Sequence, residues 1–375
     1  MSSIAFIDLA SQRERLQPGL DQAIARVIAG GQYIMGPEVA EFEAALSAFC
    51  GARHSLGCAS GTDALGLALM ALEVKPHTAV LCPSFTFAAT AEVVAWLGAV
   101  PVFVDCDPVT FNATAEHFAQ GLKTARDQDV EVVGIITVDL FGQPADYDTI
   151  EAFCEEEDLW LIVDAAQSFG GHYKGRKAGS IGRLATTSFY PAKPLGAYGD
   201  GGAVFTDNDE LQNKLVSLRV HGQGEDRYDN VRIGMNGRLD TLQAAILLQK
   251  LAILADEIDA RQRVADRYAT GLAGLVKPPE VIDHTVSAWA QYTVQLEEGV
   301  ERGPVLQKLR EAGVPTAIYY PKPLHRQTAY RHYPTAGNGL PVSDEQAKRV
   351  FSLPMHPYLN EADQGRVIDA VAEAL

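Results

Sequence analysis

Short apolar runs alternate with amphipathic segments of helical length between Cys58 and about Val220. Such alternation is typical of a mostly parallel sheet covered by helices on both faces. The apolar runs predict strands over residues 80–82, 102–104, 132–140, 160–164 and 202–205. The segments between them predict helices over residues 62–71, 88–97, 147–156 and 210–218. The sequence therefore predicts an α/β fold.

The pattern changes near Asp240 to a helical period, with Leu247, Leu251, Leu254 and Ile258 at i, i+4, i+7 and i+11. We expect one long helix here, joining a large domain (residues 1–245) to a small C-terminal domain (residues 246–375). In the small domain, residues 291–296 alternate like a strand, while 302–311 and 343–351 have helical patterns. These elements predict a smaller α+β unit.

Charge and cysteine content narrow the function classes. The 375 residues include 31 Lys and Arg against 48 Asp and Glu, a net charge of −17. A surface this acidic repels polyphosphate, so nucleic acid is not an expected partner. The five cysteines are scattered without zinc-ligand spacing, which indicates reduced thiols and a cytoplasmic protein.

Targeting and membrane signals are not expected either. The N-terminal residues lack a basic region followed by an apolar one, so we expect no secretory signal. The apolar stretch 79–104 contains Glu92 and is interrupted by Pro83 and Pro101, which favours a strand, a helix and a strand over a membrane span.

Common catalytic motifs are missing from the sequence. Neither GxxxxGK[ST] nor GxGxxG occurs, so a P-loop or dinucleotide fingerprint has no support. GxSxG and HExxH are also absent, which removes the simplest hydrolase and zinc-protease interpretations.

Two segments of the predicted α/β region carry groups suited to bind a ligand: backbone amides and a hydroxyl in the first, and a carboxylate in the second. Ser60-Gly61-Thr62 enters a helix and leaves amide groups and a hydroxyl for a phosphate, although an ordinary N-cap is the more common explanation. Asp164 ends an apolar strand at the edge where open α/β sheets bind ligands. A buried carboxylate needs a cationic or hydrogen-bonding partner, such as a protonated pyridine nitrogen; capping of the next turn is the alternative.

Two further segments carry cationic groups. Lys193 lies between apolar residues and prolines near several glycines, where partial burial lowers an amine's pKa toward the range of a Schiff-base lysine. A lysine that extends to solvent over an apolar surface is the alternative. The segment 234–240 contains Asn236 and Arg238, which suit phosphate or carboxylate, although local pairing in a charged loop is the default.

Together these segments resemble the DegT/DnrJ/EryC1/StrS family of sugar-nucleotide aminotransferases. The resemblance runs from Gly31-Gln32-Tyr33-Ile34-Met35-Gly36-Pro37 to Leu353-Pro354-Met355-His356-Pro357-Tyr358-Leu359, with the motifs in the family's order. It implies the fold type I of pyridoxal-phosphate-dependent transferases, as in aspartate aminotransferase. It also implies a homodimer with shared active sites, and pyridoxal 5′-phosphate as cofactor.

The resemblance assigns roles to individual residues. Lys193 matches the lysine that attaches the cofactor covalently and then transfers protons, and Asp164 matches the partner of the pyridinium nitrogen. Gln167 matches a neighbour of the cofactor's phenolic oxygen, and Phe87 matches a ring that stacks on the pyridine, with a core aromatic as the alternative. Gly61, Thr62 and Ser188 match phosphate ligands on this chain. Asn236 matches a cofactor contact that the partner subunit delivers.

The closer resemblance is to members that aminate C3 of a UDP-linked 2-acetamido-3-oxo-hexuronic acid, with glutamate as donor, for surface polysaccharide such as lipopolysaccharide. It implies that Arg238 contacts substrate from the partner subunit. Tyr319 is a further expected substrate contact; it stands where those relatives tend to carry histidine, which leaves the sugar open. His325 is a possible substrate contact or a surface histidine.

The sequence is compatible with three other functions. The family's dehydratases carry histidine in place of the lysine, so Lys193 favours transamination. A C4 (or C3) aminotransferase of a deoxy-keto-sugar nucleotide fits the same core motifs. A non-catalytic regulatory protein that binds the cofactor is the third alternative, because a fold does not establish activity.

Overall fold

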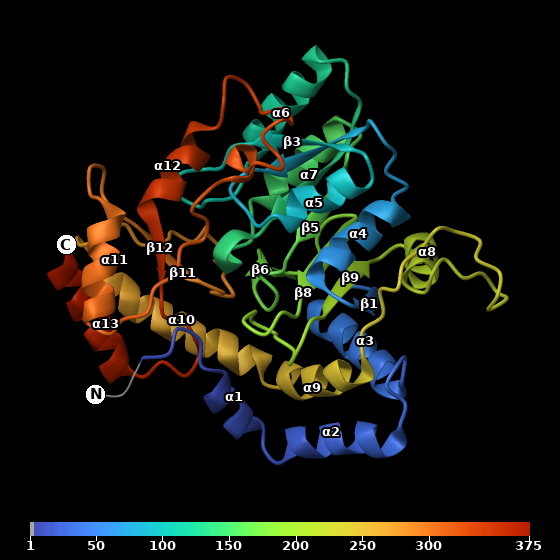
Figure 1. The fold of residues 1–375 in the computed structure, drawn as a ribbon, viewed down its shortest axis with the longest axis horizontal. Helices are drawn as coiled ribbons and strands as arrows, with labels where there is room; N and C mark the ends of the chain where they lie inside the picture. Colours follow the sequence, from blue (N-terminus) through green and yellow to red (C-terminus); the bar gives the residue numbers. More distant parts are fainter. Residues whose placement is uncertain (1–3) are drawn as a thin grey trace.

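A seven-stranded sheet forms the centre of the computed structural model, which describes residues 4–375 (Figure 1). In spatial order its strands are β1 (His54–Cys58), β9 (Gly202–Thr206), β8 (Leu184–Ser188), β5 (Trp160–Asp164), β4 (Val132–Val138), β2 (Ala79–Pro83) and β3 (Val100–Val104). The pairs from β3 to β8 are parallel, whereas β9 is antiparallel to both β8 and β1. The predicted α/β fold with a mostly parallel sheet is confirmed.

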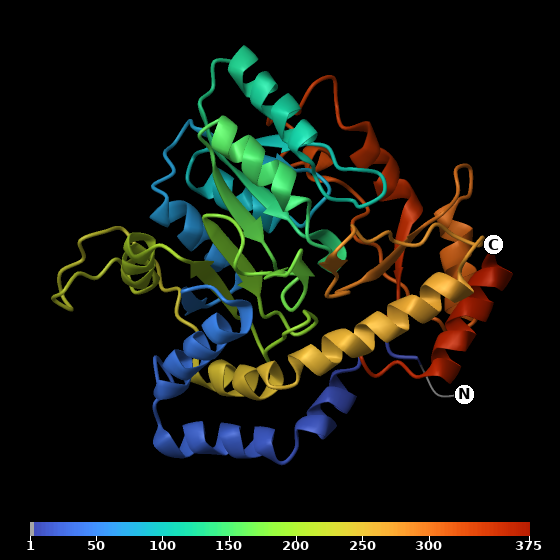
Figure 2. The same ribbon diagram turned by 180° about the vertical axis from the view of Figure 1, so that it is seen from behind.

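Helices cover both faces of this sheet. Two of them, α4 (Gly61–Ala71) and α5 (Ala89–Trp96), lie in front of the sheet in Figure 1 and pack on each other. On the opposite face, seen in Figure 2, lie α6 (Ala115–Asp127) and α7 (Tyr147–Glu156). A further helix, α8 (Asp209–Arg219), packs against α4 and β1. Each helix buries its apolar side on the sheet, and together they form the larger core.

The chain between the sheet and the C-terminal unit forms two helices where the sequence predicts one. They are α9 (Thr241–Leu251) and α10 (Leu254–Gly271). The amide of Ile253 donates to the carbonyl of Lys250, three residues back, at 3.2 Å, and this tight turn ends α9. The single long helix is therefore wrong, although Leu247, Leu251 and Leu254 are buried as its period predicts.

A second, smaller core lies at the far end of α10. It collects residues from α10, from the antiparallel pair β11 (Tyr292–Gln295) and β12 (Val350–Leu353), and from α11 (Arg302–Glu311) and α13 (Glu361–Ala374). In Figure 2 α10 runs from beside α9 to this unit. The α+β character of the unit agrees with the sequence; the boundary after residue 245 stays a prediction.

One predicted helix of this unit is too long. Residues 343–351 were expected to be helical, but α12 (Pro341–Arg349) ends before Val350, which begins β12. Val350 and Phe351 are buried and pair with Gln295 and Val294 of β11. A β-branched and an aromatic residue fit this buried, pleated position, so tertiary pairing overrides the helical pattern.

The remaining elements surround these two cores. They are α1 (Leu9–Leu16), α2 (Gly19–Gly30), α3 (Pro37–Cys50), the short sheet β10 (Thr285–Val286), β6 (His172–Tyr173) and β7 (Arg176–Lys177), and the 3₁₀ turns η1 (Leu140–Gly142) and η2 (Leu324–Arg326). Among residues 4–375, no helix is both long and apolar enough to cross a membrane.

Candidate active site

Asp164 is the last residue of β5, at the carboxyl edge of the parallel strands. Its side chain is buried (8% exposed), and Oδ1 accepts a hydrogen bond from the amide of Ala166 at 3.0 Å. Burial raises the pKa of this carboxyl group, while the nearby Lys193 lowers it. The structure therefore brings Asp164 and Lys193 together, as the sequence predicts for a shared ligand.

Lys193 lies in the turn between β8 and β9. The turn is tight: the amide of Lys193 donates to the carbonyl of Tyr190 at 2.8 Å, and that of Ala197 to Phe189 at 2.7 Å. Burial lowers the pKa of the Lys193 amine, and Asp164 opposes this shift. A lowered pKa makes the neutral, nucleophilic amine more accessible near neutral pH.

The N-terminus of α4 approaches the end of β8 very closely. A Cβ on Gly61 would lie 2.6 Å from the Cβ of Ser188, and one on Gly202 would lie 2.4 Å from the carbonyl oxygen of Ser60. Ser60 caps the helix by accepting the amide of Asp63 at 3.0 Å. The first-turn amides, which include that of Thr62, and the Ser188 hydroxyl thus lie beside one another and suit an anion.

Phe87 and Tyr320 form the aromatic part of the site. Phe87 is 57% exposed, so the alternative that it is a core aromatic is wrong; Phe85 takes the core position. The rings of Phe87 and Tyr320 are 6.3 Å apart. The exposed ring of Phe87, next to Tyr320, offers an apolar face to a ligand.

Gln167 connects the Asp164 turn to these aromatics. Its Oε1 accepts the amide of Phe141 at 2.7 Å, and its Nε2 donates to the hydroxyl of Tyr320 at 3.5 Å. Burial raises the pKa of Tyr320, and the charge of Asp164 raises it further, which places this phenol close to the carboxylate. Sequence reasoning missed Tyr320; its position next to Tyr319 was the available signal.

Tyr319 lies at the edge of the same cluster. Its ring is 5.8 Å from that of Tyr320. Burial raises the pKa of Tyr319, with a smaller contribution from Tyr190, which belongs to the Lys193 turn. Tyr319 is therefore close to the predicted site, and its contact with substrate stays a prediction.

Asn236 and Arg238 lie in a separate polar hollow of about 390 Å³. They share it with Ile34, Ala59, Gly199, Asp200, Asp240 and Gln243. Arg238 is partly buried, and its Nε has no hydrogen-bond partner among the described residues. Within residues 4–375 of one chain, no hydrogen bond or ion pair joins Asn236 or Arg238 to Lys193 or Asp164.

His325 is not a surface histidine. It is 8% exposed, its Nδ1 lies 2.7 Å from the hydroxyl of Ser84, and its Nε2 lies 3.3 Å from Oδ1 of Asp344. Burial lowers the pKa of His325, and Asp344 opposes the shift. Both ring nitrogens thus face partners within the chain, and these contacts give no support to a role in substrate binding.

A second buried carboxylate, Asp139, lies behind Asp164 and was not predicted. It follows β4, and its side chain accepts the hydroxyls of Tyr147 and Ser168. Burial raises the pKa of Asp139 to about 7, and Asp164 contributes to the shift. Its own amide donates to the backbone carbonyl of Asp164 at 3.1 Å. The turn that carries Asp164 and Gln167 is therefore held from behind.

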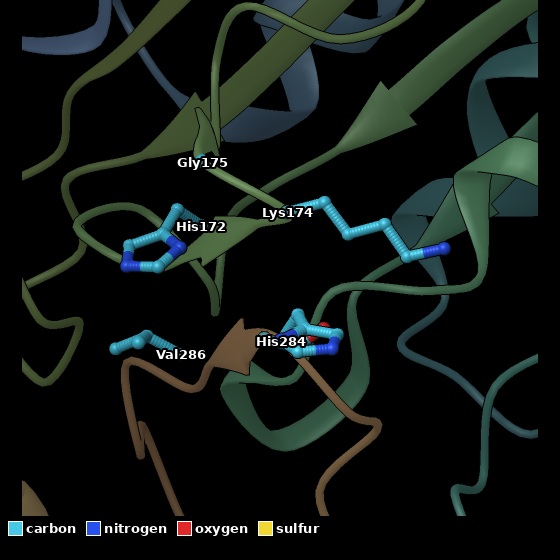
Figure 3. A pocket seen from close by; sticks show the side chains of 6 residues that line it. His172, Lys174, Gly175, His284 and Val286 are labelled. Atoms are coloured by element: carbon cyan, nitrogen blue, oxygen red, sulfur yellow. The ribbon is translucent and has the colours of Figure 1, made fainter.

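Other parts of the chain offer weaker sites. One hollow, of about 630 Å³, lies on the short sheet between His172 and His284, where the Lys174 side chain extends away from both imidazoles (Figure 3). None of the predicted site residues lines it. The part of the chain that the structure describes holds no group of three metal-ligating side chains, and all five cysteines are free and buried.

Comparisons with known proteins give a consistent result. Residues 15–372 match the DegT/DnrJ/EryC1/StrS aminotransferase family. The chain is 47% identical over 360 residues to a UDP-2-acetamido-2-deoxy-3-oxo-D-glucuronate aminotransferase of Pseudomonas aeruginosa, covering 96% of this chain and 97% of the relative. It is 38% identical over 375 residues to a UDP-N-acetyl-3-dehydro-alpha-D-glucosamine 3-aminotransferase of Acidithiobacillus ferrooxidans, covering 100% of this chain and 98% of that protein.

A solved structure agrees with these sequences. The crystal structure of a DegT/DnrJ/EryC1/StrS aminotransferase from Brucella abortus superposes with a TM-score of 0.96 at 52% identity and covers 99% of both chains. The similarity therefore includes the sheet, the small unit and every segment that carries a predicted site residue.

Proposed function

Because the chain belongs to the DegT/DnrJ/EryC1/StrS aminotransferase family, we propose that it transfers an amino group from glutamate to C3 of a UDP-linked 2-acetamido-3-oxo-hexuronic acid. It is a pyridoxal-phosphate-dependent aminotransferase of nucleotide sugars. The observation that carries the choice of sugar is the 47% identity to the Pseudomonas aeruginosa aminotransferase, and the observation in the structure that carries the cofactor chemistry is the proximity of Asp164 to Lys193.

The side chains around this pair fit the cofactor. The close approach of Gly61 to Ser188 puts the first-turn amides of α4 beside the Ser188 hydroxyl, whose oxygen accepts the amide of Tyr190 at 3.2 Å and whose O–H would donate to the phosphate group. Asp164, a buried carboxylate, is suited to hold the proton of the pyridine nitrogen, and the exposed ring of Phe87 is suited to stack on the cofactor ring. When bound, pyridoxal phosphate supplies an electron sink for carbanion charge.

Each residue of the site would have its own role in the reaction. Lys193 would hold the cofactor covalently, and its amine, once displaced by the donor, would take the proton from the donor's α-carbon and deliver it to the cofactor. Asp164 would place a negative charge beside the ring nitrogen and so would stabilise its protonated form. Gln167 is fixed by the amide of Phe141 and donates from Nε2 to the hydroxyl of Tyr320, and it would lie near the cofactor's phenolic oxygen.

The substrate contacts and the assembly are part of the same proposal. Ile34, which is 52% exposed, lines the hollow that holds Asn236 and Arg238, and two further exposed apolar side chains lie close to its lining residues in the sequence: Tyr33 (48%) and Ile233 (91%). Exposed apolar surface of this kind is typical of an interface. We place a second copy of the chain here, so that Asn236 and Arg238 reach the partner's cofactor and substrate. The free cysteines support a reducing, cytoplasmic location.

The substrate assignment is tested with purified protein, pyridoxal phosphate, glutamate and a panel of keto-sugar nucleotides. We expect amination at C3 of the UDP-linked 3-oxo-hexuronic acid, identified by mass spectrometry and NMR. Amination only at C4 of a deoxysugar would replace the sugar in the proposal, and Tyr319 would be the first residue to re-examine. Cofactor binding without any turnover of glutamate would favour a regulatory protein.

The shared site is tested by mixing two inactive variants, Lys193→Ala and Asn236→Ala. If Asn236 serves the partner's site, mixed dimers contain one site with both native residues, and a fraction of the activity returns. Subunit exchange confirmed by mass spectrometry without any recovered activity would contradict the shared site.

A further inference from the structure

Lys250 is a buried cation that the proposed reaction does not use. It lies on α9, is 1% exposed, and its Nζ donates to the backbone carbonyl of Gly196 at 2.6 Å. The ammonium group also lies 4.3 Å from the centre of the Tyr198 ring. Gly196 and Tyr198 follow Lys193 by three and five residues, so both contacts hold the turn that carries Lys193.

A second side chain of α9 holds the same turn. Gln243 lies seven residues before Lys250, two helical turns away on the same side of α9. Its Oε1 accepts the amide of Tyr198 at 2.9 Å, and its Nε2 donates to the carbonyl of the same residue at 3.4 Å. The turn after Lys193 is therefore fixed at two places by one rigid helix.

The turn is short enough to transmit this restraint to Lys193. The amide of Ala197 bonds to Phe189, and that of Lys193 bonds to Tyr190, so the segment closes on itself. A Cβ on Gly196 would lie only 2.3 Å from the carbonyl oxygen of Pro191. A shift of the Gly196 carbonyl would displace the residues on which the position of Lys193 depends.

Burial of an ammonium group is costly unless the group has a specific partner. Burial lowers the pKa of Lys250 to about 8, and the charge of Glu257 on α10 opposes the shift. An apolar side chain of similar length would fill the same space without this cost but could not bind a carbonyl. The hydrogen bond to Gly196 is therefore the property that distinguishes lysine from methionine here.

We propose that Lys250 is a positioning residue: its hydrogen bond to Gly196 fixes the turn of Lys193 and so places the Lys193 amine beside Asp164. The inference rests on the role proposed above for Lys193. It requires no contact between Lys250 and the cofactor or substrate.

The experiment uses Lys250→Met and a matched control, Lys177→Met. Lys177 makes the same two kinds of contact, with the carbonyl of Phe49 at 2.6 Å and the Phe49 ring at 4.5 Å, but it is exposed and its partner lies on α3, outside the turn. Hydrogen–deuterium exchange of peptides covering residues 189–199 is measured in the cofactor-free protein. We expect about tenfold faster exchange in Lys250→Met, as for a lost hydrogen bond from a charged donor, and no change in Lys177→Met.

Kinetics of the holoenzyme supply a second readout. A misplaced amine should lower kcat roughly tenfold or more while leaving KM for glutamate unchanged. If Lys250→Met does not fold, Lys250→Gln undergoes the same two measurements. Glutamine keeps an N–H donor on a shorter side chain, so the turn should exchange faster than in the wild type, but by less than the roughly tenfold expected for complete loss of the contact.

Lys193→Ala separates this inference from the proposed function. We expect this variant to keep the wild-type exchange of the turn and to lose activity. Activity of Lys193→Ala would refute the role of Lys193. Wild-type exchange in the folded Lys250 variant would overturn the role of Lys250, whatever the role of Lys193.

Discussion

Replacing Gly61 by alanine tests the close packing at the predicted phosphate site. The new Cβ would lie 2.6 Å from the Cβ and 3.1 Å from the Cα of Ser188, whereas ordinary contact begins near 3.4 Å. The shortest of these contacts must lengthen by about 0.8 Å. Ser188 cannot easily retreat, because its backbone pairs with Gly202 of β9, which is itself packed against Ser60.

Forced insertion of a methyl group into such packing typically destabilises a protein by about 1–3 kcal/mol. The displacement also separates the α4 amides from the Ser188 hydroxyl, so Gly61→Ala should weaken the binding of pyridoxal phosphate as well. Urea unfolding of the cofactor-free protein measures the first effect, and a fluorescence titration with the cofactor measures the second.

Gly66→Ala is the matched control on the same helix. Its Cβ would meet the nearest atom, in the ring of Trp96, at 3.7 Å, an ordinary contact. Alanine in a helix interior is favoured over glycine by about 0.5–1 kcal/mol, so this variant should be as stable as the wild type or more stable. Equal stability and equal cofactor affinity of the Gly61→Ala and Gly66→Ala variants would refute the reasoning.

Two further predictions concern titratable groups. Asp164→Asn keeps the shape but removes the charge beside the ring nitrogen; a charge-assisted hydrogen bond is worth about 1.5–3 kcal/mol, so kcat should fall at least 10- to 100-fold, and an unchanged kcat at saturating substrates would exclude this role. Burial lowers the pKa of His356, although Asp8 opposes the shift. As the pH falls below about 6.5, the unfolded chain therefore takes up a proton at His356 before the folded chain does. The stability that neutral His356 contributes is complete above that pH and is lost as the pH falls through the folded-state pKa. Urea unfolding between pH 7.5 and 5 should show a weaker loss of stability in His356→Gln than in the wild type; parallel curves would contradict the assignment.

The sequence predicted most of the central sheet because its parallel strands are buried on both faces and read as continuous apolar runs. It did not predict β1, with the sequence His-Ser-Leu-Gly-Cys, or β8, with Leu-Ala-Thr-Thr-Ser. These strands contain few large apolar residues, and their pairing with β9 depends on residues distant in the chain. Periodicity within a segment carries no information about such partners.

In the site, too, the sequence predicted residues with an unusual local setting and missed residues whose roles depend on distant parts of the chain. Asp164 and Lys193 were found because each has an unusual local setting: a carboxylate that ends an apolar strand, and a lysine among prolines and glycines. Asp139, Tyr320 and Lys250 were missed because their roles depend on contacts across the fold. Tyr147 and Ser168 donate hydrogen bonds to Asp139, and Lys250 donates to a carbonyl 54 residues away in the sequence.

Reduction of the cofactor-loaded protein with borohydride, followed by peptide mass spectrometry, tests whether Lys193 is the residue that attaches the cofactor. The reagent fixes pyridoxal phosphate to the amine that holds it. We expect the added mass on the peptide that contains Lys193, and its complete loss in Lys193→Ala. A label on another lysine, or an unlabelled Lys193 in protein shown to have bound the cofactor, would contradict it.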